Sequence, residues 1–252
     1  MSLRDSWRLA VGTLTRIPVK PPETIDRPTA GLAMALAPLT AVPAAGGVAL
    51  LVWLSQEGHL APLAMGLVAV GFLAWLNRLL HLDGLSDTVD GLTASTDRAR
   101  SLEVMRSGTA GPAGVVALVV VIGIQAVSLG ALTTHDLGPL LAAACVVASR
   151  SALAVACVRG VPAARPDGLG ATVAGTVHPV TALLVFLATA GLVWVAALLP
   201  GFDLGGLLAP ALALVALAGV LVVARRRLGG VTGDVLGACV EVTLVVLLLC
   251  VA

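Results

Sequence analysis

The residues best suited to chemistry in this sequence are three aspartates in the stretch HLDGLSDTVDG, residues 81–91. Asp83, Asp87 and Asp90 stand at positions i, i+4 and i+7, so in a helix they lie within roughly 60° of one another. Carboxylates this close repel one another unless a cation lies among them or some are protonated. Because oxygen ligands suit hard cations, the stretch predicts a site for Mg²⁺ or Mn²⁺. The alternative is a solvated acidic turn between two membrane helices.

Two more acids share one face of the final apolar segment. Asp234 opens this segment, where the helix dipole favours a carboxylate and the side chain can cap the helix. Glu241 lies about 10 Å deeper. A carboxylate facing lipid at that depth is costly, so we expect it to face the site or a polar partner. The sequence GGVTG before Asp234, which contains Thr232, brings bare backbone N–H groups to a helix start, a common anion cradle.

The composition identifies the class of protein. Of the 252 residues, 58% are hydrophobic and 12% are charged, whereas a soluble domain carries about 25% charged residues. The net charge of +1 and an aromatic content of 3% with no tyrosine give no basis for binding nucleic acid. The four cysteines lie in apolar segments without CxxC spacing and are interpreted as small core residues. The chain is therefore predicted to be a polytopic membrane protein.

Apolar runs of spanning length predict about seven transmembrane helices. They cover residues 29–54, 60–80, 112–132, 137–158, 179–199, 206–224 and 234–252. Pro38 and Pro43 are expected to kink the first run. Residues 3–17 form an amphipathic pattern, typical of a helix that lies in the membrane interface or packs on the bundle.

These elements predict an all-α fold, a polytopic membrane helix bundle with an N-terminal interfacial helix. We expect a single integral-membrane domain over residues 1–252. Within it, residues 1–28 form the interfacial amphipathic segment and its linker, and residues 29–252 form the transmembrane bundle.

The basic residues predict the orientation of this bundle. Connections at 55–59, 133–136 and 200–205 contain no Lys or Arg, and all 15 basic residues fall on the opposite side or near its helix ends. By the positive-inside rule, the N-terminus and the aspartates face the cytoplasm, and the C-terminus is extracytoplasmic. Three other loops share the aspartates' side and can together assemble a site for metal and phosphate: residues 95–111, 159–178 and 225–234.

The predicted chemistry is metal-assisted phosphoryl transfer. A divalent ion held by the three aspartates would bind a diphosphate and stabilise the leaving phosphate. One of the carboxylates, or the neighbouring His81, would accept a proton from an attacking hydroxyl. Guanidinium groups suit phosphate oxygens, although membrane topology alone is the better explanation of each single arginine. The candidates are Arg16, Arg98, Arg106 and Arg165.

The stretch HLDGLSDTVDG resembles the signature of the cobalamin synthase family, the adenosylcobinamide-GDP ribazoletransferases. The resemblance spans nearly the whole chain, because other matching blocks follow in the same order. They are TRIPV at 15–19, RSLEVMR at 100–106 followed by Gly111 and Gly114, GLG at 168–170, and GGVTGDVLGA at 229–238 with Glu241 behind it. One departure is that family members usually carry an acid just after the MR of RSLEVMR, whereas residues 107–114 here read SGTAGPAG.

The resemblance implies a late step of cobalamin biosynthesis at a bacterial plasma membrane. In that step, adenosylcobinamide phosphate passes from adenosylcobinamide-GDP to α-ribazole or its 5′-phosphate, with Mg²⁺. GMP is released, and adenosylcobalamin or its 5′-phosphate forms. Association with other cobalamin-assembly enzymes is also expected. Besides the four arginines, the expected substrate contacts are Gly168, Gly170, Thr232, Asp234 and Glu241.

Two alternatives remain at this stage. A CDP-alcohol phosphotransferase also uses an aspartate-rich motif in a helical membrane bundle, but its pattern is DGxxAR, and no Arg follows Asp83-Gly84 in that way here. A cation transporter would place acids near the bilayer midplane in broken helices. Here the aspartates lie at one membrane edge and only Glu241 is deep, which makes a transporter the weaker alternative.

Overall fold

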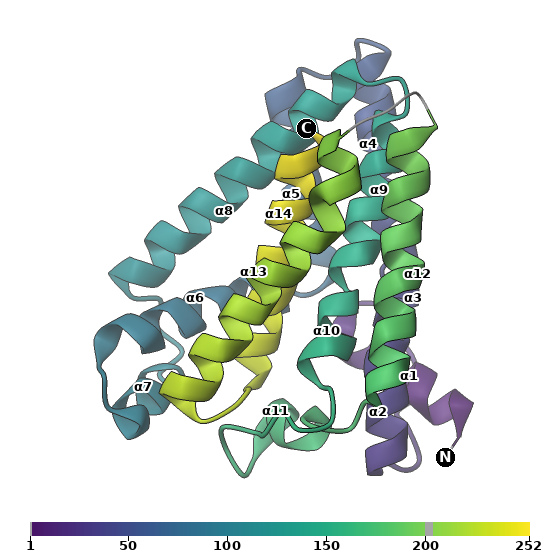
Figure 1. Ribbon diagram of the computed structural model, residues 1–252. Helices are drawn as coiled ribbons and strands as arrows, with labels where there is room; N and C mark the ends of the chain where they lie inside the picture. The colour runs from purple at the N-terminus through teal and green to yellow at the C-terminus, as the bar shows by residue number, and fades with distance from the viewer. Residues whose placement is uncertain (1, 200–203) are drawn as a thin grey trace.

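The computed structural model describes residues 2–199 and 204–252, and its regular elements are all helical (Figure 1). No strand occurs in these ranges, which hold only two isolated β-bridges. The predicted all-α class is confirmed. The helices are α1 (Leu3–Leu14), α2 (Arg27–Ala35), α3 (Ala37–Thr40), α4 (Val42–Gln56), α5 (Pro62–Leu76), α6 (Leu80–Ala94), α7 (Arg98–Val104), α8 (Pro112–Ala131), the 3-10 turn η1 (Leu132–Thr134), α9 (Gly138–Ser149), α10 (Ser151–Ala156), α11 (Gly168–Val173), α12 (Pro179–Leu198), α13 (Leu204–Leu228) and α14 (Gly233–Val251).

Several of these helices are long and apolar enough to cross a membrane. In the part of the chain that the structure describes, five pass by length and composition, or six if the bent pair α5–α6 forms one span. The predicted multi-span bundle is confirmed, with about seven as an approximate number of spans. The five are Pro112–Thr134, Gly138–Ala156, Pro179–Leu198, Leu204–Leu228 and Gly233–Val251.

The first expected span, residues 29–54, is divided into α2, α3 and α4. Pro38 and Pro43 stand in the first turns of α3 and α4, directly after the breaks at Leu36 and Ala41. Proline cannot donate the backbone hydrogen bond that would continue the preceding helix, but it fits a first turn well. The predicted kinks are thus confirmed, and they are complete interruptions of the helix.

A sharp turn at Arg78 and Leu79 separates α5 from α6. Both residues have positive φ angles, 58° and 59°, a conformation that is unfavourable for side chains other than glycine. The Arg78 guanidinium donates to the carbonyl oxygens of Gly12 and Thr13 at the end of α1, which holds the turn in place. As a result α6 turns by 92° from α5 and lies across the beginnings of α14 and α8 (Figure 1).

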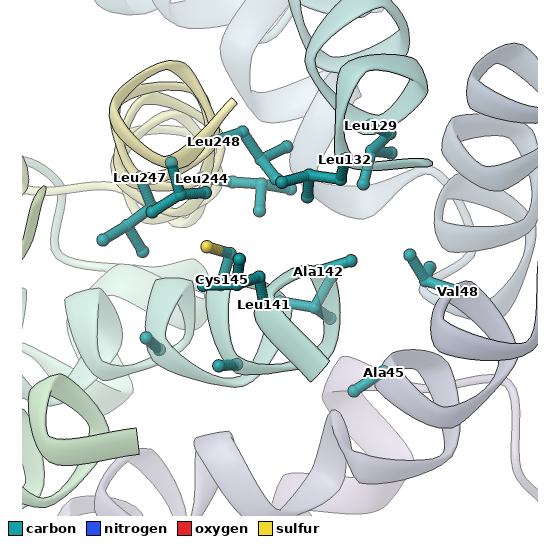
Figure 2. Close-up of a cluster of buried hydrophobic side chains, with 14 of the residues drawn as sticks. Ala45, Val48, Leu129, Leu132, Leu141, Ala142, Cys145, Leu244, Leu247 and Leu248 are labelled. Atoms are coloured by element: carbon teal, nitrogen blue, oxygen red, sulfur yellow. The ribbon is translucent and has the colours of Figure 1, made fainter. Parts of the chain in front are cut away.

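The apolar core forms around α14 and α9. Figure 2 shows side chains from α4, α8, α9 and α14, together with η1, packed against one another. In the most apolar stretch of the spans Gly233–Val251 and Gly138–Ala156, 67% and 72% of the residues are buried. In the corresponding stretches of α8, α12 and α13 the buried share is only 28–33%. The outer helices therefore present apolar faces outward, as expected of a multi-pass membrane protein. The labelled core residues in Figure 2 are Ala45, Val48, Leu129, Leu132, Leu141, Ala142, Cys145, Leu244, Leu247 and Leu248.

The N-terminal helix α1 packs on α2 and α3. Ala10, Val11 and Leu14 are buried, whereas Leu3 and Trp7 on the same apolar stripe remain exposed. Of the two alternatives for this segment, the structure therefore shows packing on the bundle. Contact of α1 with the membrane interface stays a prediction.

The connections group at two ends of the bundle, as the basic residues indicated. Gln56 Nε2 donates to the carbonyl oxygen of His135 at 2.7 Å, so the 55–59 and 133–136 connections lie together. The C-terminus lies at this same end, and α7 and α11 lie at the other (Figure 1). The third connection of the group, 200–205, falls largely outside the described residues.

Candidate active site

The predicted aspartates lie on α6, which crosses the beginning of α14 at very short range. A Cβ atom on Gly84 would lie 2.6 Å from the carbonyl oxygen of Asp234, so only glycine allows this approach. The crossing brings Asp83 and Asp87 within electrostatic range of Asp234. These three residues, called the acidic group below, come from segments that lie about 150 positions apart in the sequence.

The environment of the acidic group favours a bound cation. Burial and repulsion from Asp83, Asp234 and Asp90 raise the pKa of Asp87 to about 6. In the described part of the chain, neither Asp83 nor Asp87 takes part in a side-chain hydrogen bond or a salt bridge, so both carboxylates are available. Unpaired oxygen ligands that repel one another suit Mg²⁺ or Mn²⁺.

A complete set of ligands is not preformed. No cluster of three or more His, Cys, Asp or Glu side chains in the described ranges has the geometry of a metal site. The described side chains would therefore supply only part of the ligands of a bound cation.

Asp90 lies within electrostatic range of Asp87, but its carboxylate is engaged by the protein backbone, and the three-aspartate metal site stays a prediction. Its carboxylate oxygens accept hydrogen bonds from the backbone N–H groups of Gly111 at 2.7 Å and Gly114 at 2.8 Å. Asp90 is buried and holds the first turn of α8, a position at which the helix dipole favours a negative charge. A Cβ atom on Gly111 would lie 2.5 Å from this carboxylate, which explains the glycine at that position.

His81 also lies away from the aspartates, contrary to the prediction that it is catalytic. It stands about 200° and 240° around the helix from Asp83 and Asp87, and its ring is buried in the bundle. There His81 Nδ1 lies 3.2 Å from Asn77 Nδ2 and 3.9 Å from Glu241 Oε1. This placement does not allow direct proton transfer to or from a substrate beside the acidic group.

Arg165 is the arginine that lies beside the acidic group. Its guanidinium donates to the carbonyl oxygen of Leu102 at 2.8 Å, and its Nη1 lies 3.7 Å from Asp234 Oδ2. Arg106, which forms an exposed ion pair with Asp167, lines the same cavity as Arg165, a space of about 340 Å³ between α7 and residues 164–166. A larger cavity of about 500 Å³, on the other side of α7, extends to Asp90 and Arg100.

Arg98 and Arg16, predicted to clamp phosphate, instead contact the protein itself. Arg98 donates to the carbonyl oxygen of Ala164 at 2.9 Å. Arg16 donates its backbone N–H to Leu76, and its guanidinium lies 5.0 Å from the centre of the Trp75 ring. These contacts join connections between helices and place neither guanidinium against the acidic group.

The GLG and GGVTGD blocks lie side by side. A Cβ atom on Gly170 would lie 2.8 Å from the Cα of Thr232, so α11 and the start of α14 are in backbone contact. Gly168 begins α11 with a φ of +79°, which favours glycine. Thr232, rather than Asp234, caps α14, since its Oγ1 accepts from the N–H of Val235 at 3.2 Å. The Thr232 hydroxyl also donates to the Asp234 carboxylate at 3.1 Å.

Comparison with known sequences agrees with the resemblance that the GLG and GGVTGD blocks indicated. The family described as cobalamin-5-phosphate synthase matches residues 6–252. This chain belongs to the cobalamin-5-phosphate synthase family. A relative from Nocardioides sp., named adenosylcobinamide-GDP ribazoletransferase, is 53% identical over 98% of both chains.

Two further relatives carry the same name. The protein of Frankia casuarinae is 40% identical over 97% of this chain and 93% of its own. The protein of Bradyrhizobium diazoefficiens is 36% identical over 96% and 91%. No solved structure matches this member of the cobalamin-5-phosphate synthase family significantly.

Three polar residues of this family member were not assigned to a site from the sequence. Asn77, Gln125 and Arg150 are buried around His81 and Glu241. Gln125 Nε2 donates to Glu241 Oε2 at 2.6 Å, which confirms that Glu241 faces a polar partner rather than lipid. Arg150, assigned from the sequence to the basic end of a helix, is instead buried at the α9–α10 break. In the sequence, the one sign of a buried role for these three residues is that each is a polar residue inside an apolar run.

The different roles of Asp90 and Asp83 predict opposite effects on stability. Asp90→Ala leaves two backbone N–H groups without acceptors and is expected to lower the free energy of unfolding by about 1–3 kcal/mol. Asp83→Ala, on the same helix, removes repulsion and is expected to leave stability unchanged or raise it. Thermal unfolding of both variants in detergent measures this difference. Equal losses in the two variants would show that Asp90 has no special structural role.

Proposed function

We propose that this chain is an adenosylcobinamide-GDP ribazoletransferase. It transfers adenosylcobinamide phosphate to α-ribazole or its 5′-phosphate, releases GMP and forms adenosylcobalamin or its 5′-phosphate. The observation that carries this proposal is 53% identity over 98% of the chain to a relative with that name. The match over residues 6–252 also favours this activity over the CDP-alcohol phosphotransferase alternative.

The transfer exchanges a phosphoanhydride bond for a phosphate ester bond. The 3′-hydroxyl oxygen of the ribazole forms a bond to the phosphorus attached to cobinamide, and the bond from that phosphorus to GMP breaks. The hydroxyl proton passes to a carboxylate of the acidic group, because His81 is buried on the opposite face of α6.

Asp83 and Asp87 are the side chains that would hold Mg²⁺ or Mn²⁺, with Asp234 beside them. When bound, such an ion supplies positive charge that neutralises the diphosphate and the departing GMP. Arg165, anchored to Leu102 and facing Asp234, is suited to hold a phosphate oxygen at the edge of this group. Thr232 and the N-terminus of α14 keep the Asp234 carboxylate in position.

The proposed orientation places the acidic group on the cytoplasmic side of a bacterial plasma membrane. The N-terminus is then cytoplasmic and the C-terminus extracytoplasmic. In support, connections 55–59 and 133–136 lack basic residues and lie together, at the end away from α7 and α11. The exposed apolar faces of α8, α12 and α13 would contact the lipid bilayer. Association with other cobalamin-assembly enzymes stays a prediction.

The proposed activity predicts that Asp83→Asn and Asp87→Asn each lower turnover at least about a hundredfold, while the protein remains folded. The assay contains purified protein in liposomes, adenosylcobinamide-GDP, α-ribazole and a titration of Mg²⁺. Glu57→Gln, an acid at the opposite end of the bundle, is the control and should leave the rate unchanged. Near-normal rates of both aspartate variants at saturating Mg²⁺ would contradict the assignment.

The orientation predicts which engineered cysteines react from outside intact cells. In a background without the four native cysteines, Glu57→Cys should react with a membrane-impermeant reagent, and Thr96→Cys should react only after cell lysis. Both positions are exposed, so accessibility within the fold does not distinguish them. Labelling of position 96 but not 57 in intact cells would reverse the proposed orientation.

A further inference from the structure

Five polar side chains meet inside the bundle, and none of them is more than 5% exposed. Each comes from a different element: the residue after α5, then α6, α8, the α9–α10 break and α14. We call them the buried polar cluster, and they are Asn77, His81, Gln125, Arg150 and Glu241.

The cluster is connected through Glu241 and His81. Glu241 accepts a hydrogen bond from Gln125 at 2.6 Å and lies 3.9 Å from the His81 ring, which in turn lies 3.2 Å from the Asn77 amide. Arg150 lines two small cavities, one shared with Asn77 and His81 and the other with Gln125 and Glu241. The positive charge of Arg150 and the negative charge of Glu241 attract each other across this space.

Protein stability alone does not explain why five polar side chains are buried together. Taking charges out of water is costly, and well-packed apolar residues often stabilise a core equally well or better. On α14, Glu241 interrupts an apolar face, since Val240 belongs to one apolar core and Leu244 to another. Buried polar contacts are best known for fixing the relative register of the helices that carry them.

The helix that joins this cluster to the acidic group is α6. It is only 15 residues long and follows a left-handed turn, so its rotation must be fixed by its own contacts. His81 is the residue of α6 that reaches the cluster, and the α6 backbone at His81 would lie 3.0 Å from a Cβ atom on Gly237 of α14. Rotation of α6 about its axis would move Asp83 and Asp87 away from Asp234.

We propose that the buried polar cluster is a positioning device for the site. His81, which is paired with the Asn77 amide and lies beside Glu241, fixes the rotation of α6 so that Asp83 and Asp87 face Asp234 and Arg165. His81 is thus a positioning residue, which acts through the aspartates on the other face of its helix. Only the catalytic consequence of this arrangement rests on the proposed function.

The geometric part is tested without substrate or metal. Spin labels at Ala94→Cys on α6 and Val180→Cys on α12, both exposed, report the placement of α6 relative to the opposite side of the bundle (Figure 1). The background again lacks the native cysteines. His81→Leu, which leaves no unpaired charge in the bundle, is expected to broaden a narrow distance distribution. Thr243→Val is the matched control, because among the described residues buried Thr243 bonds only to its own helix, at the Cys239 carbonyl oxygen.

The catalytic part is tested with the same variants. His81→Leu should lower kcat at least tenfold and raise the Mg²⁺ concentration for half-maximal rate, with KM for α-ribazole unchanged. His81→Gln, which keeps a hydrogen-bonding side chain, should recover part of kcat. If His81→Leu does not fold, two other variants are measured instead. The double variant Glu241→Gln/Arg150→Gln neutralises both charges together and should leave the distance distribution narrow. The single variant Glu241→Gln leaves Arg150 unpaired and should broaden the distance distribution.

A narrow distance distribution and wild-type kcat in His81→Leu, or no difference between the single and double Gln variants, would overturn the proposal. If His81→Leu lowered thermal stability without changing the distance distribution or kcat, the proposal would also be overturned, because that result marks a purely structural role. If the wild-type protein lacked transferase activity but the distances changed as expected, the proposed function would fail while the positioning role stood.

Discussion

Backbone contact between α6 and α14 arises because Gly84 offers no side chain where the two helices cross. The acidic group depends on this contact, since Asp83 and Asp87 come from one helix and Asp234 from the other. The crossing is enclosed by further contacts from distant segments. Asp90 joins α6 to the start of α8, and Thr232 joins the start of α14 to α11. The glycines of the family blocks therefore matter mainly because they allow these backbones to approach.

The aspartates of α6 have different functions because their surroundings differ. All three lie on one side of the helix, yet only Asp90 meets backbone N–H groups, at the start of α8. Asp83 and Asp87 meet other carboxylates and Arg165 instead. Repulsion in this group raises the pKa of Asp87, and the same repulsion is what a divalent cation would relieve. A single helix thus carries one carboxylate that is bonded to the backbone and two that are not.

Much of this arrangement could be predicted from the sequence, because periodicity and hydrophobicity act locally. Asp83 and Asp87 were expected on one face, and Glu241 was expected to have a polar partner. The role of Asp90 could not be predicted, since its partners Gly111 and Gly114 are more than 20 positions away. Arg150 was assigned to a helix end because the positive-inside rule gives the side of the membrane for a basic residue, not how deeply its side chain is buried. The turn at Arg78 and Leu79 was also missed, because neither residue type favours a positive φ.

The central claim is that Asp83 and Asp87, rather than Asp90, bind the cation that accompanies the diphosphate. The most direct test is Mn²⁺ binding, followed by electron paramagnetic resonance, to purified protein with adenosylcobinamide-GDP and no acceptor. We expect Asp83→Asn and Asp87→Asn to weaken Mn²⁺ binding at least tenfold, and a folded Asp90→Asn variant to bind Mn²⁺ with nearly wild-type affinity. Loss of Mn²⁺ binding in Asp90→Asn, with binding retained in the other two variants, would contradict this account.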